Sequence, residues 1–103
     1  MTLQDLTFAP VHQLVRGLQQ RRVSPVDLVE ACLERIEALE PRLHAYTEVF
    51  AQEARLAAEA ADTAIRAGHA VGPLHGIPIA LKDLVEIEGK VATGGSAVWR
   101  DRV

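Results

Sequence analysis

Residues 72–83 read Gly-Pro-Leu-His-Gly-Ile-Pro-Ile-Ala-Leu-Lys-Asp, and this stretch gives the strongest indication of the fold class. A loop marked by glycine and proline leads into residues 77–81, which are apolar on both faces of a strand. A strand of this kind is normally buried within a larger sheet. Pro78 cannot donate a hydrogen bond to a neighbouring strand, so it belongs near the start of the strand. We therefore expect a buried strand that ends at Lys82.

Two helices are expected well upstream of this strand. Apolar residues recur with helical spacing along residues 11–22, which predicts a helix that ends near residue 22. Ser24, Pro25 and Asp27 form a helix start, because serine caps free amides, proline fits the first turn and the aspartate completes a capping box. Helical periodicity then continues until Pro41, where we expect the second helix to stop.

The rest of the chain mixes helical and extended signals. Residues 43–50 are prone to form a strand, and residues 51–67 predict a third helix that contains eight alanines. Gly68 is the expected C-cap of that helix. Residues 84–93 are expected to form a second short strand or a hairpin, and residues 94–96 a turn.

These elements do not complete a sheet within 103 residues. A strand that is apolar on both faces needs neighbours on both edges, and three helices with at most two strands cannot supply them. We therefore expect an α/β fold that is incomplete in this chain. Residues 1–70 are the N-terminal helical region, and residues 71–103 begin the α/β core of one partial domain.

The composition excludes several classes of protein. The chain is 49% hydrophobic, with a formal net charge of −3, and its longest apolar run has five residues. A membrane span needs about 20, and the first residues lack the regions of a secretory signal. One cysteine and four scattered histidines favour neither a disulfide nor a zinc site. Neither the first nor the second half of the chain is basic enough to favour binding of nucleic acid. We expect a cytoplasmic protein without metal, cofactor, nucleic acid or membrane partner.

Lys82 is the candidate catalytic residue. Nine of the eleven basic residues are arginine, and Lys82 and Lys90 are the only lysines. A lysine that is moved into a dry site loses its preference for the charged form, and the neutral amine can act as a general base. Arginine does not deprotonate in proteins and could not take this role. The alternative is a lysine whose side chain extends from a strand end into water.

We expect structural rather than catalytic roles for three other residues with reactive or polar side chains. Cys32 lies on the apolar stripe of its helix, which favours a small buried hydrophobic residue over a reactive thiol. His75 has no serine or cysteine partner that the sequence places beside it, so we expect a loop histidine without a catalytic role. Gly94-Gly95-Ser96 has the spacing of neither a phosphate loop nor a nucleophile elbow, and Ser96 is expected to bond nearby backbone amides.

Residues 72–83 resemble the lysine-bearing segment of the amidase signature enzymes, without interruption over twelve residues. The likeness continues into Thr93, Gly95 and Ser96. The upstream helices from Ser24 onward, including the alanine-rich third helix, are similar to the N-terminal region of that family. The resemblance therefore covers nearly the whole chain, and its most specific part is the segment that carries Lys82.

The resemblance implies an amide C–N bond hydrolase with a mixed central sheet covered by helices. Members use a Ser–cis-Ser–Lys triad, in which the lysine that matches Lys82 is the neutral base, and they need no metal or cofactor. Both serines lie in a downstream Gly- and Ser-rich loop, whereas this chain has only Ser24 and Ser96, which match neither. The resemblance thus implies the N-terminal fragment of an amidase, inactive alone, whose complete enzyme takes a small-molecule amide.

Two alternatives stay open. The A subunit of a glutamine-dependent tRNA amidotransferase belongs to the same family, but usually carries asparagine where this chain has Leu84. The other alternative is a non-catalytic helical interaction module, whose apolar faces are buried against a partner or, in a homodimer, against a second copy. Whether this chain is itself an enzyme therefore stays undecided at the level of sequence.

Overall fold

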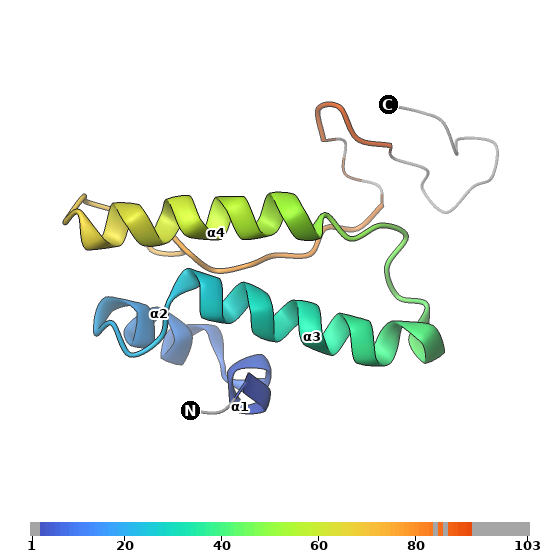
Figure 1. Ribbon diagram of the computed structural model, residues 1–103, viewed down its shortest axis with the longest axis horizontal. Coiled ribbons are helices and arrows are strands. Elements are labelled where there is room, and N and C mark those ends of the chain that lie inside the picture. The colour runs from blue at the N-terminus through green and yellow to red at the C-terminus, as the bar shows by residue number, and fades with distance from the viewer. Residues whose placement is uncertain (1–2, 84, 86, 92–103) are drawn as a thin grey trace.

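The computed structural model describes residues 3–83, 85 and 87–91. In this part of the chain there are four helices: α1 (Leu3–Phe8), α2 (Val11–Gln19), α3 (Pro25–Leu43) and α4 (Ala51–Arg66). Helices α3 and α4 pack side by side and run in opposite directions, while α1 packs against α3 on the side away from α4 (Figure 1). The segment after α4 turns back and runs along that helix (Figure 1).

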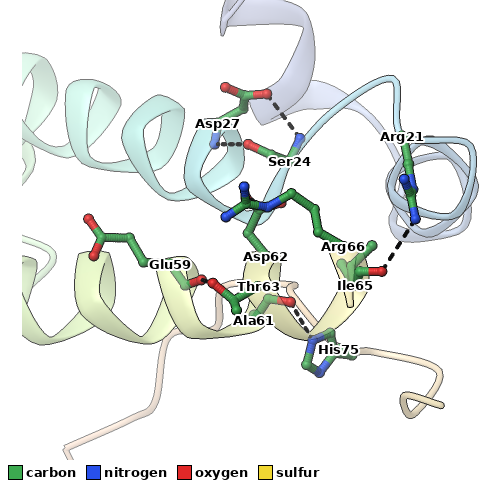
Figure 2. Close-up of polar contacts among 10 residues, drawn as sticks. All are labelled: Arg21, Ser24, Asp27, Glu59, Ala61, Asp62, Thr63, Ile65, Arg66 and His75. Atoms are coloured by element: carbon green, nitrogen blue, oxygen red, sulfur yellow. Dashed lines mark hydrogen bonds and ion pairs between the residues drawn. The ribbon is translucent and has the colours of Figure 1, made fainter. Parts of the chain in front are cut away.

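A capping box starts α3, as the sequence predicts. The backbone N–H of Asp27 donates to Ser24 Oγ at 3.0 Å, and the N–H of Ser24 donates to Asp27 Oδ2 at 2.9 Å (Figure 2). These two bonds satisfy amides that the first turn of a helix leaves without partners. Pro25 follows as the first helical residue, where the missing N–H of proline costs nothing.

The expectation that Pro41 stops α3 is wrong, because the helix continues to Leu43 with Pro41 inside it. Pro41 removes only one backbone hydrogen bond, and it lies in the last turn of the helix. Only two helical residues follow it, so the helix tolerates the proline there. His44 ends the helix in the left-handed region at φ 47°, and its N–H donates to Glu40 O at 2.9 Å. The Glu40 carboxylate then accepts the N–H of Tyr46 at 3.0 Å, which holds the next loop against the helix end.

The ends of α2 and α4 differ in how well the sequence predicts them. Helix α2 stops at Gln19 rather than near residue 22, because Arg21 adopts φ 57° and the N–H of Arg22 donates back to Gly17 O at 2.9 Å. Helix α4 agrees with its predicted bounds. Gly68 follows its C-cap with φ 77°, the left-handed conformation that glycine adopts without strain.

The expected strands are not seen in the described residues. Residues 44–50 form the loop between α3 and α4, so the prediction of a strand at 43–50 is wrong. Residues 77–81 are extended but pair with no strand in the part of the chain that the structure describes. Of residues 84–93, those described lie in turns and irregular backbone, and the turn expected at 94–96 lies outside the described residues. A β-strand is defined by its hydrogen bonds to a neighbouring strand, so the sheet stays a prediction.

The core lies where α1, α2 and α3 meet. Leu28 of α3 is 2% exposed and lies at its centre. Ile77, from the segment after α4, packs against the same cluster, so this segment reaches the core of the helices. The buried members of the cluster are Leu6, Leu18, Val23, Leu28 and Ala31.

We predict that Leu28→Ala lowers the free energy of unfolding by about 2–5 kcal/mol, because it leaves a cavity in a closely packed core. The control is Leu56→Ala, since Leu56 is 57% exposed on α4, and its loss should be within about 0.5 kcal/mol. Urea unfolding followed by circular dichroism measures both. Equal losses for the two variants would contradict this description of the core.

Candidate active site

A groove of about 400 Å³ lies between α3, the loop that precedes α4, and the segment that follows α4. Its walls are mainly apolar. Helix α3 contributes Val29, Cys32, Leu33 and Ile36, the loop contributes residues 46–50, and the returning segment contributes residues 78–83. Lys82 and Lys90 both line this groove and contribute its positively charged side chains.

Lys82 lies at the rim of the groove with its side chain exposed. Its carbonyl accepts the N–H of Val85 at 3.0 Å, so a backbone turn follows it directly. The neighbouring apolar side chains are also open to water, with Ile79 76% and Leu81 50% exposed. The described residues therefore place Lys82 beside an apolar hollow but do not bury it, and the dry surroundings of a neutral lysine stay a prediction.

His75 contacts a helix backbone and makes no contact with Lys82 that the structure describes. Its Nε2 lies 3.0 Å from the carbonyl oxygen of Ala61 in α4, so the protonated Nε2 donates to that carbonyl (Figure 2). The ring is partly buried there. This contact ties the start of the returning segment to α4.

Gly76 brings the backbone of the returning segment close to the helices. It adopts φ 86°, and a Cβ at this position would lie 2.9 Å from Pro25 Cγ and 3.4 Å from Leu18 Cδ1. Both the backbone conformation and the lack of space require glycine. Gly76 therefore fixes the segment against the start of α3, six residues before Lys82.

Lys90 holds the other end of the segment. Its Nζ lies 4.3 Å from the centre of the Phe50 ring and pairs with Oε1 of Glu53 in the first turn of α4. Reasoning from the sequence did not single out Phe50, Glu53 or Lys90 as a cluster. The signal that was available is that Lys90 is the second of two lysines in a chain that otherwise uses arginine.

An ion pair joins the two long helices beside the groove. Arg55 Nε of α4 donates to Glu30 Oε1 of α3 at 2.6 Å, and Arg55 Nη2 donates to Glu30 Oε2 at 3.3 Å. The hydrogen bond from Arg55 and its positive charge lower the pKa of Glu30. Both groups are exposed, so water screens this pair and it adds little to the stability of the packing between α3 and α4.

The remaining candidate residues behave as packing and capping groups. Burial raises the pKa of the Cys32 thiol, which keeps it protonated and poorly nucleophilic at neutral pH. Ser24 is engaged in the cap of α3, and Ser96 lies outside the described residues.

The described stretches bring together no group of three metal-ligating side chains. They also hold no helix with the length and apolar character that a membrane span requires.

Comparison with known proteins identifies the family. The family model described as Amidase matches residues 27–103, which include α3 from its third residue, α4 and the whole returning segment. The chain belongs to the amidase family.

The relatives carry two different names. A protein named Amidase from Pseudomonas putida is 40% identical over 94 residues, which make up 91% of this chain and 20% of that protein. The A subunit of glutamyl-tRNA(Gln) amidotransferase from Geobacter metallireducens is 44% identical over 98 residues, 95% of this chain and 19% of the relative. Its counterpart from Granulibacter bethesdensis is 45% identical over 98% of this chain and 19% of the relative. The chain thus spans about a fifth of their length. No solved structure matches it.

We predict that Gly76→Ala destabilises the protein by about 1–3 kcal/mol, because alanine is strained at this φ and its methyl group meets Pro25. Gly72→Ala is the matched control, since a Cβ on Gly72 meets no atom within 4 Å, and it should stay within about 1 kcal/mol of the wild type. Thermal unfolding of both variants measures the difference. A Gly76→Ala protein as stable as the control would show that the close approach does not exist.

We predict that Cys32 reacts with iodoacetamide more slowly than glutathione does at pH 7.5, because a raised pKa leaves less thiolate. The rate should climb as the pH rises through and above the ordinary range of a cysteine. Mass spectrometry of the alkylated chain over time measures it. A rate at pH 7.5 equal to or above that of glutathione would contradict the half-buried placement of the thiol.

Proposed function

We propose that this chain is the N-terminal part of an amidase that hydrolyses amide C–N bonds, with Lys82 as the general base of a Ser–cis-Ser–Lys triad. The observation that carries the proposal is the place of Lys82. It lies within the region that matches the family, on a segment fixed to the helices at Gly76, and at the rim of an apolar groove.

The proposed chemistry assigns one proton transfer to this chain. The neutral amine of Lys82 accepts a proton, through the bridging serine, from the hydroxyl of the nucleophilic serine. That serine oxygen attacks the amide carbon, the C–N bond breaks, and ammonia or an amine leaves with the returned proton. Water then releases the acid from the acyl-enzyme. Backbone amides near the serines stabilise the oxyanion.

Residues that this chain lacks are needed for the rest of the reaction. Neither Ser24 nor Ser96 matches a triad position, so we infer that residues 1–103 alone are inactive. Residues 1–70 act as the helical support, and residues 71–103 begin the α/β core whose sheet would cover the exposed face of residues 77–81. The substrate is a small-molecule amide, no metal or cofactor takes part, and the enzyme works in the cytoplasm.

A second candidate is the A subunit of a glutamine-dependent amidotransferase, working in a complex with partner subunits. Its support is the identity of 44% and 45% to relatives that carry that name. Leu84, which stands where that subunit usually has asparagine, favours the amidase. A panel of aliphatic and aromatic primary amides, with glutamine beside them, separates the two by ammonia release: glutamine alone as substrate would favour the amidotransferase.

Sequencing of the native coding region beyond the codon for Val103 is the first test. The proposal expects the reading frame to continue into a Gly- and Ser-rich loop that carries two serines. A stop codon directly after Val103 would overturn it. The non-catalytic helical module, with its apolar faces buried against a partner or a second copy, would then be the better account.

We predict that Lys82→Ala and Lys82→Arg each lower kcat/KM of the whole enzyme for its best amide by at least about 10³-fold, since a triad member is lost. Arginine keeps the charge but cannot act as a base. Gln52→Ala, an exposed change on α4, is the control and should keep full activity. Ammonia release measures activity, and urea unfolding should show all three variants folded. Full activity of either Lys82 variant would refute the assignment.

A further inference from the structure

Helix α4 holds the lysine-bearing segment at two points. Ala61 O accepts from the His75 ring at 3.0 Å, and the Glu53 carboxylate pairs with Lys90. The two anchor residues are eight positions apart on the helix, or about 12 Å along its axis. Lys82 lies between the two anchors in sequence, seven residues after His75 and eight before Lys90. Its place in the groove therefore depends on both.

The anchor at Lys90 is built from three groups. The ammonium lies 4.3 Å from the centre of the Phe50 ring, and at the same time it pairs with Glu53. The Lys90 side chain is 24% exposed, against 63% for Glu53, so the cation is the shielded member of the pair. A cation over an aromatic face gains more where water is partly excluded. Phe50 and Glu53 flank the start of α4, so this anchor joins the segment to a rigid helix end.

Backbone turns carry the restraint from Lys90 towards Lys82. The N–H of Lys90 donates to Ile87 O at 3.0 Å, and the N–H of Val85 donates to Lys82 O at 3.0 Å. Each bond closes a backbone turn, one that begins at Lys82 and one that ends at Lys90. Lys82 and Lys90 also line the same groove. A shift of the Lys90 anchor therefore moves the backbone that presents Lys82.

We propose that Lys90 is a positioning residue for Lys82: by binding Phe50 and Glu53 it fixes the downstream end of the segment and so sets where the Lys82 amine lies in the groove. The inference rests on the proposed amidase function. Lys90 touches neither substrate nor reacting atoms in this account, and its effect on the reaction passes through Lys82.

The test compares Lys90→Ala with Lys90→Arg in the whole enzyme, using ammonia release from its best amide. We expect Lys90→Ala to lower kcat about 10- to 100-fold with KM nearly unchanged, as small misplacements of a catalytic group do. Lys90→Arg should restore kcat to within about 3-fold, since arginine also pairs with carboxylate and stacks on rings.

Three further variants separate the loss of the Lys90–Glu53 pair from a general loss of charge. Glu53→Ala should lower kcat like Lys90→Ala, and the double variant should be no worse than either single one, because both remove the same anchor. Glu59→Ala, which removes an exposed carboxylate elsewhere on α4, is the matched control and should leave kcat unchanged.

The outcomes are distinguishable from those of the proposed function. Unchanged kcat in Lys90→Ala, while Lys82→Ala is inactive, overturns the positioning role alone. A loss of kcat that follows a loss of stability, or that comes with a matching rise of KM and no rescue by arginine, also overturns it. Activity that survives Lys82→Ala overturns the proposed function and this inference together.

Discussion

The contact between Gly76 and Pro25 joins the two parts of this molecule. A Cβ on Gly76 would come within 2.9 Å of Pro25 Cγ, so a residue without a side chain lets the backbone of the returning segment reach the start of α3. The capping box of Ser24 and Asp27 sets where α3 begins and therefore where Pro25 lies. Ile77, next to Gly76, completes the attachment by packing against the helical core.

The helices serve as a support for a segment that has little structure of its own. Residues 77–82 form no helix and pair with no strand among the described residues, yet their path is set by attachments before and after them. Upstream, Gly76 and the His75 ring meet α3 and α4; downstream, Lys90 meets Phe50 and Glu53. This arrangement explains how an exposed, apolar stretch can hold a lysine at a groove.

Local signals in the sequence predict the start of α3 and the bounds of α4, whereas they did not indicate α1 (Leu3–Phe8). The start of α3 follows from Ser24, Pro25 and Asp27, and α4 with its Gly68 end follows from alanine content and glycine chemistry, because each depends on neighbours along the chain. The end of α3 differs from the prediction because Pro41 disrupts a helix less in its last turn than in its middle. The strand at 77–81 depends on distant partners, so no local pattern decides it.

The site also combines residues that local sequence indicates with residues that only the fold brings together. The segment around Lys82 could be assigned to a family from its own residues, and the family model confirms that assignment over residues 27–103. The cluster of Phe50, Glu53 and Lys90 could not, because its members lie up to 40 residues apart in sequence and meet only through the fold. The most direct test of this account is an NMR measurement of nuclear Overhauser effects in the chain. We expect cross-peaks from Gly76 Hα to the Pro25 ring and the Leu18 methyl groups. Random-coil shifts for residues 72–91 without such cross-peaks would contradict the attachment of this segment to the helices.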